Sequence, residues 1–134
     1  MDLSFRPTMK LLLDTHALIW ALSDSERLPH RVEDLLSDPA NHVWASAVNV
    51  YEIEFKRSRS AELAALPADI EDAVVAVGFS WMPVDARHAA SAGRLPALHG
   101  DPFDRLLIAQ ALAENALLVT RDPWIAPYGV PTLW

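Results

Sequence analysis

The chain has 134 residues, of which 51% are hydrophobic, and it carries a formal net charge of -7 and no cysteine. This composition predicts one globular domain, residues 9–134, after a loose leader at residues 1–8, without a segment long enough to cross a bilayer. The absence of cysteine excludes disulfides and zinc–thiolate sites, and the negative charge argues against a surface that attracts nucleic acid everywhere. Because no signal-peptide pattern is present at the start, we expect a cytoplasmic protein.

Short apolar segments alternate with longer amphipathic segments along the chain. In chain order, the patterns predict a strand at 10–13, helices at 15–22 and 29–36, a strand at 42–45, helices at 47–57 and 67–77, a strand at 81–84, helices at 86–93 and 102–115, a strand at 117–120 and an edge strand at 132–134. This alternation predicts an α/β fold with a short, mostly parallel sheet and helices on both of its faces. Ligands of such folds bind beyond the carboxyl ends of the strands.

Two isolated acids come at or close to the ends of predicted strands. Asp14 comes after three leucines, and Asp122 closely follows the strand at 117–120. Each has a purely structural alternative, because Asp14 can cap the next helix and Asp122, before Pro123, can start a turn. Their common place at strand ends nevertheless predicts one shared site.

Glu52 is an acid inside an amphipathic helical segment. At helical spacing it shares a face with Val48, Tyr51 and Phe55, which makes it a candidate for a buried functional group. Glu54 points elsewhere and can pair with Arg57 three residues on. A buried Glu52 that is only hydrogen-bonded to a neighbour is the structural alternative.

Asp104 continues an apolar helical stripe formed by Leu107, Ile108 and Ala111. A solvated capping acid has no need for that position, so the helical phase favours a functional role for Asp104. Asp101 precedes a proline at the first helical position and fits an N-cap. An outer role around a metal is the other interpretation of Asp101.

Four carboxylates at one edge of a sheet repel one another, so a divalent cation bound by Asp14, Glu52, Asp104 and Asp122 is the simplest resolution. Asp85 also follows a predicted strand, but we predict that it is a structural cap outside the site. The histidines lack a zinc spacing or a companion nucleophile, and no glycine-rich phosphate loop is present. The scattered tryptophans form no evident stacking platform for RNA.

Four segments carry a resemblance to a known family: LLLDTHALIW at 11–20, SAVNVYEI at 46–53, DPFDRLLIAQA at 101–111 and LVTRDP at 118–123. In their order and spacing they resemble the PIN-domain ribonucleases, specifically the VapC-type toxins of toxin–antitoxin systems. The resemblance implies a three-layer α/β/α fold with a short parallel sheet. It also implies a Mg²⁺ or Mn²⁺ site in which Asp14, Glu52, Asp104 and Asp122 match the four acids of the family.

The resemblance further implies that Thr15 and Thr120 support the first and last acids. It implies a homodimer, a cognate VapB-type antitoxin that covers the active site, and an endoribonuclease toxin as the function. A basic rim formed by Lys56, Arg57 and Arg121 is then the expected holder of the RNA backbone.

Two other interpretations remain at this point. A degenerate PIN fold that only binds RNA or a protein partner is one of them. The other is a Mg²⁺-dependent phosphatase with Asp14 as nucleophile, although that chemistry usually requires an acid two residues later, where this chain has His16.

Overall fold

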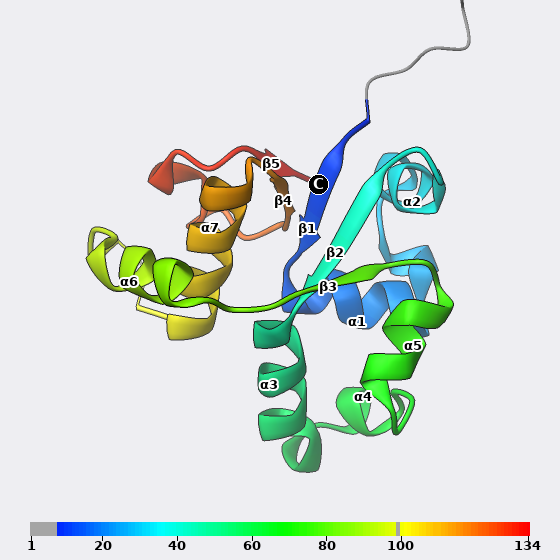
Figure 1. Ribbon diagram of the computed structural model, residues 1–134. Coiled ribbons are helices and arrows are strands. Elements are labelled where there is room, and N and C mark those ends of the chain that lie inside the picture. Colours follow the sequence, from blue (N-terminus) through cyan, green and yellow to red (C-terminus); the bar gives the residue numbers. More distant parts are fainter. Residues whose placement is uncertain (1–7, 99) are drawn as a thin grey trace, which may run out of the picture.

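A computed structural model describes residues 8–98 and 100–134 of the chain. Its centre is a five-stranded sheet in the order β3-β2-β1-β4-β5, and all four neighbouring pairs are parallel. The strands are β1 (Lys10–Leu13), β2 (His42–Ser46), β3 (Ser80–Met82), β4 (Leu117–Val119) and β5 (Thr132–Leu133). The prediction of a mostly parallel sheet is confirmed, and the short terminal strand lies at one edge of it (Figure 1).

Helices cover both faces of this sheet (Figure 1). They are α1 (Thr15–Ser23), α2 (His30–Ser37), α3 (Ala47–Lys56), α4 (Ala61–Ala64), α5 (Ile70–Ala76), α6 (Ala86–Arg94) and α7 (Pro102–Glu114). Short 3₁₀ turns occur at Ser25–Arg27, Arg57–Arg59 and Ala126–Tyr128. None of the helices in the described ranges has the length and apolar character that a membrane crossing requires.

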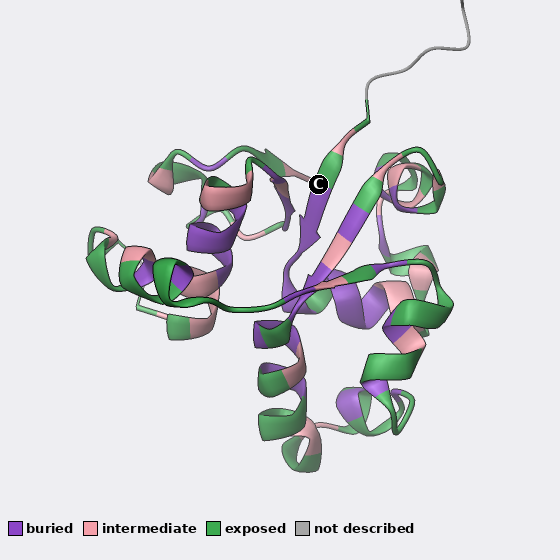
Figure 2. Ribbon diagram, in the orientation of Figure 1, coloured by how far each residue is buried: buried purple, intermediate pink, exposed green. Residues whose placement is uncertain are grey.

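The central strand β1 explains why the sheet is apolar without alternation. Leu11, Leu12 and Leu13 are all fully buried, because helices lie on both sides of them (Figure 2). Leu11 and Leu13 belong to one apolar cluster, which includes residues of α1 to α5, whereas Leu12 belongs to a second cluster with residues of α7. Successive side chains of a strand point to opposite faces, so one strand contributes to both cores. The three-layer α/β/α expectation is therefore correct.

Helix boundaries differ from the predictions mainly between α3 and β3. The helix predicted at 67–77 begins only at Ile70, because the side chain of Asp69 caps it by accepting from the backbone N–H of Asp72. The short helix α4 was not predicted, since four residues are too few for a periodic pattern to stand out. The leader predicted at residues 1–8 falls, except for Thr8, outside the described residues.

Candidate metal centre

The acids singled out in the sequence meet in one cleft of about 360 Å³. It lies at the carboxyl ends of β1 and β4, which are neighbours in the sheet. Among the described residues, five carboxylates and two cationic side chains line it, and the lining consists of Asp14, Thr15, His16, Glu52, Lys56, Asp101, Asp104, Arg121, Asp122 and Pro123. The four predicted ligands are thus on one surface, although α1, α3, α7 and the segment after β4 supply this lining.

Asp14 lies between β1 and α1 and is buried, with 8% of its surface exposed. It caps α1, since its Oδ1 accepts a hydrogen bond from the backbone N–H of Ala17 at 2.8 Å. Burial raises the pKa of the Asp14 carboxyl, and hydrogen bonds from Thr120 and Ala17 only partly offset this effect. The cap and the cleft position are therefore compatible, and neither excludes the other.

Glu52 is held in place by polar groups of two elements. The Thr15 hydroxyl donates to its Oε1 at 2.5 Å, and the Lys56 ammonium donates to its Oε2 at 2.7 Å. The amide of Asn49, fully buried, donates to the Thr15 oxygen at 3.1 Å and so fixes the hydroxyl. Asn49 was missed in the sequence, although its place three residues after Ser46 is a capping-box position.

The prediction that Glu52 shares its buried face with Tyr51 and Phe55 is wrong. Glu52 is buried as expected, but its buried neighbours on α3 are Val48, Asn49 and Ile53. Tyr51 and Phe55 are 61% and 52% exposed. The buried face of α3 is centred on the other side of Glu52, which turns both aromatic side chains outward.

Glu54 behaves as predicted. It is exposed and forms an ion pair with Arg57 at 3.1 Å.

Asp101 and Asp104 both reach the cleft from the start of α7. Asp101 caps this helix by accepting from the backbone N–H groups of Phe103 at 2.8 Å and Asp104 at 3.4 Å. Asp104 is half-buried, one turn before the fully buried Leu107 and Ile108. The capping role predicted for Asp101 is present, and its side chain lies at the cleft as well.

Asp122 and Thr120 follow β4. The hydroxyl oxygen of Thr120, almost fully buried, accepts from the backbone N–H of Asp122 at 3.1 Å. Asp122 in turn accepts from the backbone N–H of Trp124 at 2.9 Å. Thr120 therefore contacts both Asp14 and the start of the Asp122 turn.

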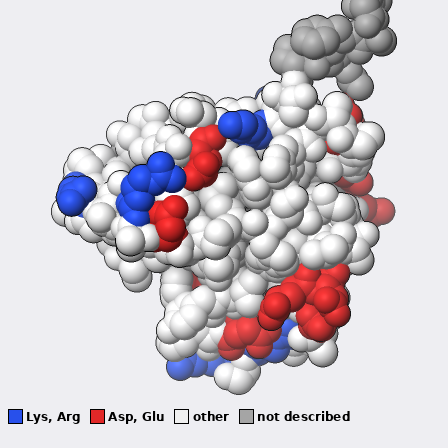
Figure 3. Space-filling model, viewed as in Figure 1, with Lys and Arg blue, Asp and Glu red and all other residues white. Residues whose placement is uncertain are grey.

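The three predicted basic residues have different positions. Lys56 and Arg121 line the cleft, and the hydrogen bond to Glu52 raises the pKa of Lys56. Arg57 does not line it, because its guanidinium donates to the carbonyls of Leu66 at 3.3 Å and Pro67 at 3.0 Å. Arg57 thus anchors the segment after α4. On the face in Figure 3, basic side chains form small separate groups and acidic ones gather over α5.

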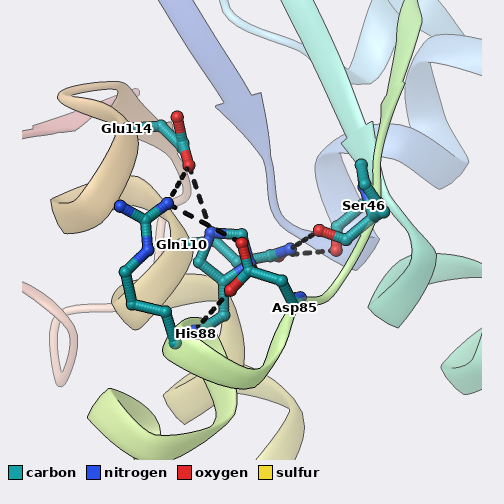
Figure 4. Close-up of polar contacts among 7 residues, drawn as sticks. Ser46, Asp85, His88, Gln110 and Glu114 are labelled. Carbon is teal, nitrogen blue, oxygen red and sulfur yellow. Dashed lines mark hydrogen bonds and ion pairs between the residues drawn. The ribbon is translucent and has the colours of Figure 1, made fainter.

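Polar contacts between the start of α3 and α7 connect two of the helices that carry the acids (Figure 4). Ser46 caps α3 and donates to Oε1 of the buried Gln110 on α7 at 2.6 Å. The Gln110 amide donates to the carbonyl of Pro83 at 3.2 Å. Because Glu52 is on α3 and Asp104 on α7, this network sets their relative placement.

Asp85 lies outside the cleft, as predicted for a structural acid. It caps α6 in a capping box with His88, whose ring also contacts Glu114 at 3.2 Å (Figure 4). The sequence suggested a polar face for this helix, yet His88 is only 2% exposed. Its partners on both sides satisfy the buried ring nitrogens.

The sequence of this chain matches the model of a known protein family. The model of the PIN domain matches residues 11–126. The chain belongs to the PIN-domain family. This PIN domain is 24% identical to the ribonuclease VapC22 of Mycobacterium tuberculosis over 138 residues, which covers 92% of the chain and 98% of that protein.

Solved structures share the fold of this PIN domain at low identity. VapBC2 from Rickettsia felis, bound to a promoter DNA fragment, matches with a TM-score of 0.66, 20% identity and coverage of 94% of this chain and 98% of the other. FitAcB from Neisseria gonorrhoeae matches with a TM-score of 0.66 and 20% identity, and the match covers 92% of this chain and 96% of the other. These likenesses establish the α/β fold.

The donor set of this PIN domain fits a hard divalent cation. All candidate ligands are carboxylate oxygens, which Mg²⁺ prefers, and burial of Asp14 leaves a charge that a cation would stabilise. Within residues 8–98 and 100–134, no group of three or more His, Asp or Glu side chains is arranged so that it could hold a metal ion by itself. Mg²⁺ keeps several water ligands, so an open group of carboxylates suits it better than a closed cage.

Proposed function

We propose that this protein is a Mg²⁺-dependent endoribonuclease and the toxin of a type II toxin–antitoxin system. The observation that carries the proposal is the cleft at the sheet edge, where five carboxylates face two cationic side chains. Such an excess of negative charge around a buried Asp14 is unfavourable without a bound cation. Membership of the PIN family and similarity to the ribonuclease VapC22 support hydrolysis of RNA.

In this proposal Asp14 and Asp104 hold the metal most directly, while Glu52 and Asp122 complete its shell, partly through water. Mn²⁺ should substitute for Mg²⁺, since both accept oxygen ligands. The bound metal would neutralise the phosphate and lower the pKa of an attacking water. The expected products carry a 5′-phosphate and a 3′-hydroxyl.

The remaining polar residues of the cleft orient these groups. Thr15, itself held by Asn49, aims Glu52 toward the cleft, and Thr120 supports Asp14. Lys56 and Arg121 face the same cleft and would contact the phosphates beside the cut. Arg57 is left out of this set, because its guanidinium is bound to backbone carbonyls.

The proposed partners follow from the comparisons. The similarity of this chain to VapBC2 and FitAcB supports a separate VapB-type antitoxin as its partner. A basic segment of that antitoxin would neutralise the carboxylates and cover the cleft. We also propose a homodimer that acts on RNA in the cytoplasm.

Asp104→Asn tests the catalytic assignment, with Asp85→Asn as the matched control on a structural acid. We expect Asp104→Asn to reduce Mg²⁺-dependent cleavage by more than about 100-fold, because loss of even an indirect metal partner costs 10- to 100-fold. Asp85→Asn should cleave at the wild-type rate. Mapping of the RNA ends would check the predicted 5′-phosphate.

Calorimetric titration with Mg²⁺ or Mn²⁺ separates the enzyme from a degenerate binding module. The proposal requires heat of binding that disappears in Asp104→Asn. Full metal-dependent cleavage by Asp104→Asn, or RNA binding by the wild type without any metal binding, would contradict it.

A further inference from the structure

Three aromatic side chains form a row on the surface beside the cleft. The ring of Phe103, at the start of α7, lies 5.7 Å from that of Tyr51 on α3, and Tyr51 lies 6.0 Å from Phe55 at an interplanar angle of 11°. Tyr51 and Phe55 are more than half exposed. A contiguous exposed apolar patch, unlike a single exposed apolar side chain, commonly marks a binding surface. We call Phe103, Tyr51 and Phe55 the aromatic row.

The aromatic row begins at the edge of the acidic cleft. Phe103 lies in the chain between Asp101 and Asp104, both of which line the cleft. The Lys56 ammonium, also at the cleft, lies 5.6 Å from the centre of the Phe103 ring. At the other end, the Arg59 guanidinium lies 5.3 Å from the centre of the Phe55 ring. A cation therefore accompanies each end of the row.

We propose that the aromatic row stacks unpaired bases of an RNA strand whose scissile phosphate lies in the cleft. This inference rests on the proposed ribonuclease function and assigns the aromatic row as the surface on which unpaired bases beside the cleavage site stack. Bases in a duplex are stacked on one another and leave no face for an aromatic ring, whereas every unpaired base has such a face. Stacking therefore selects for unpaired segments without selecting a sequence.

The negative net charge of the protein makes uncharged contacts such as base stacking important for RNA binding. At a net charge of -7, the protein as a whole repels a polyanion, so uncharged contacts must supply much of the affinity. Lys56 and Arg59 would contact phosphates on either side of the stacked bases. An exposed aromatic surface also suits a protein partner, but the cations and the continuity with the carboxylate cleft favour RNA.

The test uses the full chain with Asp104→Asn in every sample, so that RNA is bound but not cut. Fluorescence anisotropy with a short, unstructured, labelled RNA is compared with the same RNA annealed to its complement. Tyr51→Ala and Phe55→Ala are compared with Tyr51→Phe, which keeps the ring, and with Val75→Ala, which removes an exposed apolar side chain elsewhere. Light scattering of each variant gives its oligomeric state.

We expect Tyr51→Ala and Phe55→Ala each to weaken single-stranded RNA binding about tenfold, while duplex binding stays unchanged. Tyr51→Phe and Val75→Ala should bind as the parent does. Equal affinity of all variants, or no binding of single-stranded RNA by the parent, would overturn the inference. Conversion to a smaller oligomer at unchanged RNA affinity would assign the row to a protein interface instead.

The ribonuclease proposal and the inference about the aromatic row are contradicted by different results. If wild-type protein cleaves RNA in a metal-dependent reaction that Asp104→Asn abolishes, the ribonuclease proposal stands whatever the aromatic variants do. If Asp104→Asn still cleaves, the metal assignment fails before the aromatic row is considered.

Discussion

At the scale of a single residue, Asp14 has a structural task and a proposed catalytic task that oppose each other. Its carboxylate caps α1, which stabilises the helix, but the same carboxylate is almost fully buried at the cleft. Burial raises its pKa, so the folded protein holds the Asp14 proton more tightly than the unfolded chain does. The ionised form is therefore a source of instability until a cation binds.

The sign of this effect can be tested in metal-free protein. The contribution of Asp14 to stability is largest below its unfolded pKa, about 3.9, and is lost as the pH rises through its higher folded pKa. We therefore expect Asp14→Asn, which keeps a capping side chain, to unfold at a higher urea concentration than wild type at neutral pH. The difference in urea midpoint between Asp14→Asn and wild type should narrow as the pH falls toward 4.

Cleavage by Asp14→Asn should nevertheless fall by more than about 100-fold, since a proposed direct ligand is lost. Asp24→Asn, at an exposed aspartate after α1, is the control, and it should change neither the stability in urea nor the cleavage rate. A metal-free Asp14→Asn protein that is less stable than wild type at neutral pH would show that the cap outweighs the buried charge.

At the scale of an element, the placement of α3 depends on its first residues. Ser46 caps the helix through the backbone N–H of Val48 and also donates to the buried Gln110. Asn49 completes the capping box by accepting from the backbone N–H of Ser46. One turn of helix thus connects β2 to α7 and positions Glu52 at the cleft.

Two cap substitutions separate this positioning role from ordinary helix capping. Ser46→Ala leaves the buried Gln110 oxygen without its donor, so we expect a loss of about 2 kcal/mol in the free energy of unfolding and lower cleavage activity. Asp69→Ala removes the exposed cap of α5, which contributes no side chain to the cleft. Asp69→Ala should lower the free energy of unfolding by about 1 kcal/mol and leave the cleavage rate unchanged.

Urea denaturation and initial cleavage rates would check both variants. A loss of activity in Asp69→Ala as large as in Ser46→Ala would mean that general destabilisation, and not the position of α3, lowers the activity.

At the scale of the whole molecule, the proposed RNA site is a small basic feature on an acidic protein. Lys56 and Arg121 are the two cations in the described cleft lining, and Arg59 lies beside the aromatic row. Few phosphates can then be neutralised on binding. The affinity for RNA should consequently depend only weakly on salt.

The salt dependence gives a measurable slope. If Lys56, Arg59 and Arg121 each neutralise one phosphate, the logarithm of the binding constant for single-stranded RNA should fall against the logarithm of salt concentration with a slope of about −2.1. Lys56→Met should reduce that slope by about 0.7. Arg94→Met, at an exposed position on α6, should leave it unchanged. An unaltered slope in Lys56→Met would remove Lys56 from the phosphate contacts.

The sequence by itself determined the features that depend on neighbours in the chain. Strand and helix periodicity predicted the parallel α/β sheet, and three-residue spacing predicted the pair of Glu54 with Arg57. Strand ends predicted where Asp14 and Asp122 lie, because parallel strands all end at one edge. Each of these inferences uses a local repeat or the direction of the chain.

Only the tertiary structure decided contacts between distant segments. It turned Arg57 onto the carbonyls of Leu66 and Pro67, and it brought Phe103 of α7 against Tyr51 of α3. It also showed that Tyr51 lies outside the buried face of its helix. The physical reason is that helical periodicity gives the relative angle of side chains, whereas packing against the sheet and α7 decides which of those angles is buried.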